Sequence, residues 1–426
     1  MPKQNESPGE RFRYVLHFHF SFQQESQLKT HSKQSPLWSL LATAGKNMDG
    51  YQREREAWAE QISWDLKLPV YDDFGTWPNS HPLPLPKWSP PRETFSVASV
   101  EDYEELAASV ELTVQHLIQA YNYNTVGNFI RFYNEFNRSG ETNVGTFFRR
   151  YIPPITSDHH TCVGLGMELL QKLRHLEHKF PKLKNKFYLV SCEEAIDNLD
   201  GYISTDPRVS TSEKEHILVA LKILIGSRSG ILLLDPGYHV ARVITVMRDQ
   251  MYPNTGWFLQ SDEPHVRKEY CYTFAENTDY IMWMERQTRE GIEAVSRSVI
   301  YVARPYITPV HVTERRNLVY NFRSLLARDT KGHLVAGIYF PVKESANVVL
   351  FYQDGNRKYK CQVPMANSIR GKQEREIVYR CGLQLGLSVG ALETILDKVA
   401  VILGDKDFLS QLLDINREIN GISQEN

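Results

Sequence analysis

The residues whose types and spacing can do chemistry are a cysteine, a histidine and an aspartate in the middle third of the chain. Cys162 stands at the predicted start of a helix, His216 opens an apolar strand, and Asp235 closes the next apolar strand. A thiol becomes a nucleophile when it ionises, which the positive end of a helix dipole and a neighbouring imidazole both favour. A carboxylate then orients the imidazole, and backbone N–H groups at a helix start are natural oxyanion donors. The pattern therefore indicates catalysis by a Cys162 thiolate, assisted by His216 and Asp235.

Each of these residues also has an ordinary structural interpretation. A single cysteine often serves as a small buried hydrophobic residue. His216 on its own fits a histidine in the core or at a strand end, and Asp235 begins an Asp-Pro-Gly sequence that is typical of turns. The order of the three along the chain, rather than any one of them, favours the catalytic interpretation.

The elements that must position the three residues follow from the apolar pattern. Residues 162–179 predict a helix, and 187–192 a short apolar strand. The nearly unbroken apolar run 216–225 predicts a strand buried on both faces. The segment 226–230 then reads as a hairpin loop and 231–235 as the returning strand.

This hairpin raises a question of register. If the loop 226–230 is symmetric, His216 pairs near Val240 and Asp235 lies opposite Leu221, which separates the two by five residues, roughly 16 Å along the strands. A bulge, an asymmetric loop or an early end to the pairing is then needed to join them, and a slip of one residue exchanges the faces. In the symmetric register His239 lies closer to His216, and is the substitute candidate for the base.

Two glycines follow the cysteine in the predicted helix. Gly164 and Gly166 are poor helix formers. Their place in the first turns predicts a close backbone approach, either of a strand packed on the helix or of a ligand.

The chain as a whole divides into four predicted regions: 1–99, an N-terminal extension with a proline-rich segment; 100–190, a helical region with the cysteine helix; 191–365, a β-rich region; and 366–426, a C-terminal helical region. The predicted helices outside the site are 36–66, 100–122, 126–136, 372–383, 389–403 and 407–419. The predicted strands outside the site are 13–22, 270–274, 279–284, 298–303, 318–323, 333–340, 347–352 and 358–363. The segments 138–144 and 147–162 read as loop, and the spacing of the strands indicates a meander or barrel.

Composition and charge limit the classes of protein. The formal net charge is −2, with 49 basic and 51 acidic residues. This balance predicts no nucleic-acid partner and no membrane partner. Five cysteines without a CxxC pair predict a reducing compartment, and the lack of a signal segment or membrane span predicts a cytoplasmic protein. The proline-rich segment 77–92 predicts a surface connector, with docking of a partner protein as the alternative.

Histidines offer two metal-site hypotheses, and both are weak. His17 and His19 share one face of the predicted strand 13–22 but have no third ligand nearby. His159, His160 and Cys162 are too crowded for one zinc ion. We therefore expect no metal and no tightly bound cofactor.

The order of these motifs resembles the arylamine N-acetyltransferases. The similarity rests on a cysteine at a helix start, the run His-Ile-Leu-Val-Ala-Leu from His216, and Leu-Leu-Leu-Asp-Pro-Gly-Tyr around Asp235. The resemblance covers about 100–400, although its specific motifs cover only about thirty residues. It implies an α/β fold with a papain-like, transglutaminase-like core, an N-terminal helical region, a central antiparallel sheet or barrel, and C-terminal helices.

The resemblance also implies a function. Cys162 would be the nucleophile that accepts the acyl group, His216 the base and Asp235 the orienting group of a triad. The implied reaction is ping-pong transfer of an acyl group from acetyl-CoA, or another acyl-CoA as co-substrate, to an amine. The acceptor would be a small-molecule amine or a protein.

The sequence departs from that family beside the cysteine. The family has an Arg-Gly-Gly run before it, where this chain has Asp158-His159-His160-Thr161, and a polar residue and an Asn after it, where this chain has Gly164 and Gly166. These differences concern the acyl donor and acceptor pockets more than the triad. Two alternatives therefore stay open: a transglutaminase-like thiol hydrolase or protein-modifying enzyme, and an interaction protein that has lost catalysis on the same fold.

Overall fold

The computed structural model describes residues 76–423 except 157–159, 195, 197, 205, 208–210, 212, 264, 345–346 and 356. The predicted strand 13–22 and the predicted helix 36–66 lie outside these residues. The strands are β1 (Phe95–Val97), β2 (Tyr123–Asn124), β3 (Tyr188–Glu193), β4 (His216–Ile225), β5 (Arg228–Leu234), β6 (Ile244–Met247), β7 (Phe258–Glu263), β8 (Val266–Phe274), β9 (Tyr280–Arg289), β10 (Ile292–Tyr301), β11 (Phe322–Arg328), β12 (Leu334–Pro341), β13 (Asn347–Asp354) and β14 (Arg357–Pro364). The α-helices are α3 (Val100–Ala120), α4 (Thr125–Ser139), α5 (Val144–Arg150), α6 (Cys162–Leu173), α7 (Leu199–Ile203), α8 (Arg315–Val319), α9 (Lys372–Gln384), α10 (Ala391–Gly404) and α11 (Lys406–Ser423). Shorter helical turns cover Arg174–His178, Val310–Glu314 and Asn367–Ile369.

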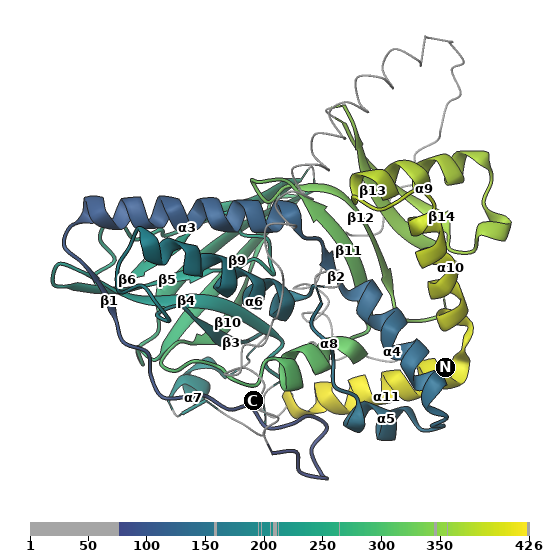
Figure 1. The fold of residues 1–426 in the computed structure, drawn as a ribbon, viewed down its shortest axis with the longest axis horizontal. Helices are drawn as coiled ribbons and strands as arrows, with labels where there is room; N and C mark the ends of the chain where they lie inside the picture. The colour runs from purple at the N-terminus through teal and green to yellow at the C-terminus, as the bar shows by residue number, and fades with distance from the viewer. Residues whose placement is uncertain are drawn as a thin grey trace. The chain divides into compact units, whose positions relative to one another are not determined.

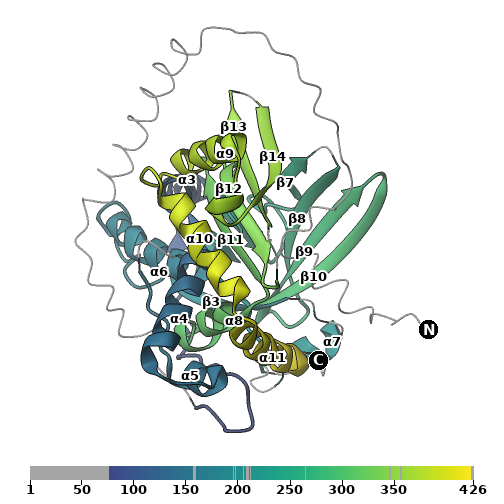
Figure 2. The ribbon, with the colours of Figure 1, turned by 90° about the vertical axis from the view of Figure 1, so that its right-hand side faces the viewer.

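The strands form two sheets instead of the one meander or barrel predicted. The first has the order β6-β5-β4-β3-β10-β9-β8-β7, and β1 pairs in parallel with the end of β4. The second has the order β14-β13-β12-β11-β2. The first sheet curls into an antiparallel half-barrel (Figures 1 and 2). With helices before and after the sheets, the mixed α/β class and the predicted N-terminal and C-terminal helical regions are confirmed.

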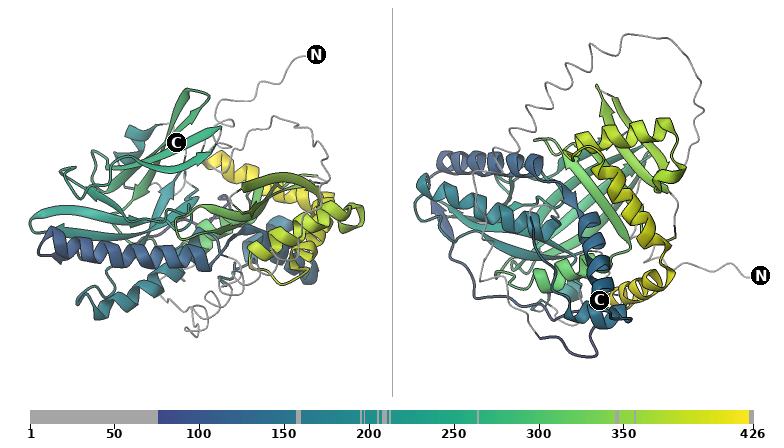
Figure 3. Two further views of the ribbon diagram at one scale, coloured as in Figure 1. Left: turned by 90° about the horizontal axis from the view of Figure 1, so that it is seen from above. Right: turned by 45° about the vertical axis from the view of Figure 1, so that its right-hand side comes forward.

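The apolar run that became β4 is buried on both faces, as predicted. Helix α6 packs against β4 and β3, and α3 lies alongside α6 (Figures 1 and 3). Ile217 and Leu189 point to α6, where a Cβ on Gly166 would lie 2.8 Å from Ile217 Cδ1. Leu218 and Ala220 point the other way, into a cluster inside the curl that also holds Tyr272 and Trp283. The glycine therefore brings the cysteine helix close to the strand that carries the histidine.

The predicted register of the β4–β5 hairpin is wrong. Ile225 pairs with Arg228, so the chain turns over two residues, 226 and 227, rather than five. Gly226 has φ +60° and stands first in the turn, as type II′ hairpins require. The observed pairing of β4 with β5 is shifted by three residues from the symmetric prediction. Because three is an odd number, each β5 side chain lies opposite β4 residues of the other face than predicted.

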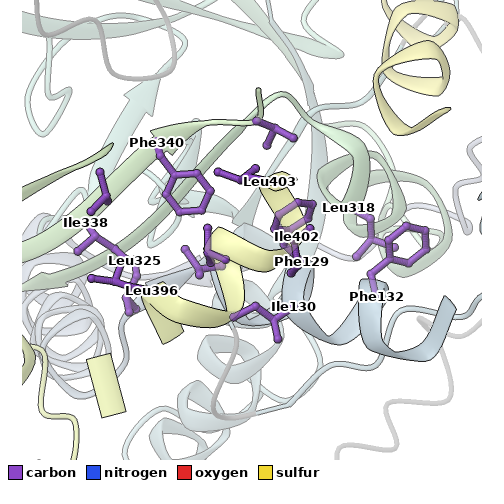
Figure 4. Packing of buried hydrophobic residues seen from close by; sticks show 14 of the residues in the cluster. Phe129, Ile130, Phe132, Leu318, Leu325, Ile338, Phe340, Leu396, Ile402 and Leu403 are labelled. Atoms are coloured by element: carbon purple, nitrogen blue, oxygen red, sulfur yellow. The ribbon is translucent and has the colours of Figure 1, made fainter. Parts of the chain in front are cut away.

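A second apolar core lies between the second sheet and the helices α4, α8, α10 and α11. Figure 4 shows Phe129, Ile130 and Phe132 of α4 meeting side chains of the second sheet and of α10. Leu318 of α8 belongs to the same cluster. The helical periodicities predicted for 126–136 and for the C-terminal segments therefore correspond to real buried faces.

Two segments have a different structure from the one predicted. The stretch expected to be loop contains α5, because the Asn143 side chain accepts a hydrogen bond of 2.7 Å from Thr146 N–H and caps this helix. Phe148 of α5 is buried in the second core. The predicted strand 318–323 is wrong over its first half, since α8 follows the π-helical turn Val310–Glu314 and β11 begins only at Phe322.

The proline-rich segment packs on the rest of the chain. Trp88 Nε1 donates to Ser191 Oγ over 3.2 Å, and Ile307 N–H donates to the Lys87 carbonyl over 3.0 Å. The Trp77 ring lies 4.7 Å from the guanidinium carbons of both Arg149 and Arg315, a cation–π arrangement. The connector interpretation accounts for these contacts, and a partner protein for 77–92 stays a prediction.

The five cysteines are all free. Within the described part of the chain, no helix has the length and apolar character needed to cross a bilayer.

Candidate functional site

Cys162 is the first residue of α6, as predicted, and it is almost completely buried, with 3% of its surface exposed. Thr161 caps the helix: its hydroxyl accepts a hydrogen bond of 3.2 Å from Val163 N–H. The His160 ring lies against the first turn where only a glycine at Gly164 leaves room for it. Both glycines of the predicted motif thus serve close packing, one against a ring and the other against a strand.

His216 and Asp235 are brought together by the observed register. Asp235 follows Leu234, the last paired residue of β5, so in this register it lies opposite Leu218, two residues from His216 and on the same face. This separation is about 7 Å along the strand, which side chains can span. His216 Nε2 lies 2.9 Å from Asp235 Oδ1. The same oxygen accepts a hydrogen bond of 2.9 Å from Tyr238 N–H, which holds the carboxylate within its own turn.

The substitute candidate, His239, is not the histidine that meets Asp235. Its φ is +58°, and its ring packs edge to face against Tyr123 at 5.7 Å. Burial, followed by the charges of Arg328 and His216, holds the pKa of His239 well below its usual range. The symmetric register that suggested this residue does not occur.

The turn that begins at Asp235 approaches Cys162 and His216 closely, as the space around Gly237 shows. A Cβ at Gly237 would lie 2.6 Å from the Cβ of Cys162 and 2.7 Å from Cε1 of His216. The Asp-Pro-Gly turn therefore lies directly against both side chains. The structure brings together the three residues that the sequence singled out: Cys162, His216 and Asp235.

The electrostatics of His216 favour its protonated form. Burial lowers the pKa of this imidazole, but the charge and hydrogen bond of Asp235, followed by the hydrogen bond and charge of Cys162, outweigh it and raise the pKa well above its usual range. Because Asp235 engages Nε2, the other ring nitrogen, Nδ1, is left for the thiol. The arrangement is that of a cysteine beside an imidazole whose protonated form is favoured, with the side chain of Asp235 on the other ring nitrogen.

Tyrosine and glutamate side chains close the site around the imidazole. The Tyr238 ring meets the His216 ring edge to face at 4.5 Å, and the Tyr238 hydroxyl donates to Glu194 Oε1 over 2.5 Å. Burial raises the pKa of Glu194 to about 7, against the lowering influence of the His216 charge. Burial, and next the charge of Cys162, raise the pKa of Tyr123 well above its usual range.

The helical segment between the two sheets, 310–319, contributes residues that the sequence did not indicate. Glu314 accepts hydrogen bonds from the Thr161 hydroxyl and, over 2.8 Å, from Asn128 Nδ2. One turn later, Asn317 Nδ2 lies 3.9 Å from Cys162 Sγ. The segment lies about 150 positions beyond the cysteine and was predicted in part as a strand, so no local signal connected it with the site.

Replacing Glu314 by glutamine is expected to weaken the pH dependence of stability. Burial raises the pKa of Glu314 from 4.5 to about 7 in the folded protein. The stabilising contribution of this carboxyl is therefore fully present below pH 4.5 and is lost as the pH rises through 7. Between about pH 5 and pH 8 the free energy of unfolding should fall by roughly 2–3 kcal/mol more in the wild type than in Glu314→Gln.

Denaturant unfolding at the two pH values measures this difference. Glu344→Gln is the matched control, because Glu344 is exposed and pairs with exposed Lys406 on the surface. The control should keep the wild-type pH dependence. Equal pH dependence in Glu314→Gln and the wild type would contradict the assignment.

Two further features of the described residues concern the binding of ligands. Among the described residues, no group of three His, Cys, Asp or Glu side chains has an arrangement that could hold a metal ion, and His159 lies outside them. A pocket of about 280 Å³ lies between α4 and α10, lined in part by Arg131, Arg138 and Lys398. Its lining does not include the triad residues, so it is a separate feature of the second core.

Comparisons with protein-family models, curated proteins and solved structures found no match for this chain. The geometry around Cys162 is therefore the basis for a functional proposal.

Proposed function

We propose that this chain is a cysteine-dependent acyltransferase resembling the arylamine N-acetyltransferases. The observation that supports it best is the contact of 2.9 Å between His216 Nε2 and Asp235 Oδ1, directly beside Cys162 at a helix N-terminus. In this proposal α6 and the strands β3 to β5 correspond to the papain-like, transglutaminase-like core, because they supply the cysteine helix and the strands that carry histidine and aspartate.

The first half of the proposed reaction loads the enzyme. Cys162 Sγ, whose proton has passed to His216, bonds to the carbonyl carbon of an acyl-CoA thioester. The bond from that carbon to the CoA sulfur then breaks, and His216 returns the proton to the leaving thiolate. Asp235 stabilises the imidazolium and fixes its orientation throughout.

The second half transfers the acyl group. An amine nitrogen attacks the Cys162 thioester and gives a proton to His216. The carbon–sulfur bond breaks, the acylated amine leaves, and the proton restores the thiol. Edge-to-face packing of Tyr238 and burial of the triad exclude bulk water, which favours transfer to an amine over hydrolysis.

Intact-mass spectrometry after incubation with acetyl-CoA tests the proposal. We expect one acetyl adduct in the wild type and none in Cys162→Ser. Cys361→Ser is the matched control, because Cys361 is more exposed than Cys162 and lies on β14, outside the triad; this variant should keep the adduct. An arylamine added afterwards should remove the adduct and become acetylated itself.

The same measurement separates the alternatives. An adduct that persists in Cys162→Ser would exclude Cys162 as the nucleophile. An adduct from p-nitrophenyl acetate or a peptide ester but not from acetyl-CoA would keep the nucleophile and favour the thiol hydrolase. No adduct from any of these donors would favour the interaction protein.

A further inference from the structure

The side chain of Asn317 occupies a distinctive place beside the thiol. Its Nδ2 lies 3.9 Å from Cys162 Sγ. Within 310–319, all of which the structure describes, Asn317 is half-buried while every other side chain is buried. This amide is therefore the part of the segment that a substrate on Cys162 can reach.

The 3.9 Å between Asn317 Nδ2 and Cys162 Sγ is long for a hydrogen bond to the thiol itself. It suits better a hydrogen bond to the oxyanion that forms when the thiol attacks a carbonyl carbon. When Sγ attacks a carbonyl carbon, the carbonyl oxygen becomes an oxyanion on the carbon now bonded to Sγ, and a donor must lie roughly 2.7–3.1 Å from that oxygen. A donor at 3.9 Å from Sγ is within reach of an oxyanion that forms on the side of the sulfur that the segment occupies. The N–H of Cys162 is a second donor, since the first amides of a helix have no acceptor within the helix.

Asn317 is held firmly in this place. Arg323, which is 1% exposed, donates to the Asn317 carbonyl over 2.6 Å and also to the Leu318 carbonyl. Three residues earlier, on the same helical face, Glu314 is bonded to Thr161, the residue before the nucleophile. The π-helical turn that leads into α8 is a geometry found often at functional sites. The segment thus contacts the start of the cysteine helix at two residues about one helical turn apart, Glu314 and Asn317.

We propose that Asn317 is a catalytic residue, whose Nδ2–H group forms an oxyanion hole together with the backbone N–H of Cys162. This proposal rests on the acyl-transfer function of Cys162. As the Sγ–carbon bond forms, the electron pair of the carbonyl π bond moves to oxygen, where the two N–H groups stabilise the charge. When the pair returns, the bond to the leaving CoA sulfur breaks and His216 supplies the proton to that sulfur.

Two reactions of the same thiol distinguish this role from simple positioning of the thiol. Acylation by p-nitrophenyl acetate passes through an oxyanion, whereas alkylation by iodoacetamide does not. In Asn317→Ala and in the isosteric Asn317→Asp, acylation of Cys162 should be about 10²–10³-fold slower than in the wild type. Alkylation of Cys162 in Asn317→Ala should keep the wild-type rate, which also shows that the site is folded.

The outcomes separate this proposal from the one on which it rests. A wild type that acylates, with Asn317→Ala acylating equally fast, overturns the oxyanion role and leaves the acyltransferase intact. Equal losses of acylation and alkylation in both variants overturn it too, in favour of a role in positioning or ionising the thiol. A wild type that alkylates but is not acylated by any donor overturns both proposals.

Discussion

Replacing Asp235 by asparagine is expected to slow the acylation of Cys162 by about 10⁴-fold at neutral pH. Asp235 is fully buried, and its Oδ1 accepts from both His216 and Tyr238 N–H. Asparagine has nearly the same shape but no charge, so the imidazolium loses its counter-ion and the correct proton arrangement on the ring is no longer enforced. The rate of acetyl adduct formation, followed by mass spectrometry, measures the effect.

The same variant should change how stability depends on pH. The charge and hydrogen bond of Asp235 hold the folded pKa of His216 well above its ordinary value of 6.5, despite the opposing effect of burial. The stability that results is fully present at and below pH 6.5 and is lost as the pH rises through the raised pKa. In Asp235→Asn the free energy of unfolding should no longer show this decrease as the pH rises above 6.5.

Asp249→Asn is the matched control for Asp235→Asn. Asp249 also accepts from a cation, Arg228, but the pair is partly exposed on the surface. Such pairs contribute little to stability and none of the triad depends on this one. The control should acylate at the wild-type rate, and a wild-type rate in Asp235→Asn itself would disprove the triad.

Replacing Gly237 by alanine is expected to remove nearly all acylation and to lower the free energy of unfolding by about 1–3 kcal/mol. The new Cβ would lie 2.6 Å from Cys162 Cβ and 2.7 Å from His216 Cε1, closer than packed carbon atoms approach. The turn, the thiol or the imidazole must therefore move. Both the acylation and the iodoacetamide alkylation of Cys162 should slow, whereas in Asn317→Ala only the acylation should slow.

Gly421→Ala controls for the effect of an added methyl group. Gly421 lies in α11, and a Cβ there meets nothing within 4 Å. This variant should keep full activity and gain roughly 0.5–1 kcal/mol, because alanine favours a helix over glycine. Full activity in Gly237→Ala would show that the turn does not lie against the triad as described.

Several features of this protein were determined by local sequence alone. The nearly unbroken apolar run from His216 to Ile225 became a strand buried on both faces, in which the charged Lys222 is only half-buried and donates from Nζ to the Ala303 carbonyl over 2.8 Å. The stripe of apolar residues from Tyr103 to Leu117 became the buried face of α3. The start of a helix at Cys162 followed from Thr161, a capping residue, directly before it.

The assembly of the site was decided by tertiary structure. A hairpin turn of two residues instead of five moved Asp235 onto the face of His216; Gly226 permits this turn, and the pairing of β4 with β5 fixes it. Asn317 and Glu314 reached Cys162 and Thr161 only because the chain between the two sheets folds back over the cysteine helix. Contacts between residues about 150 positions apart leave no periodic pattern in the sequence. They depend on packing, which only the folded chain defines.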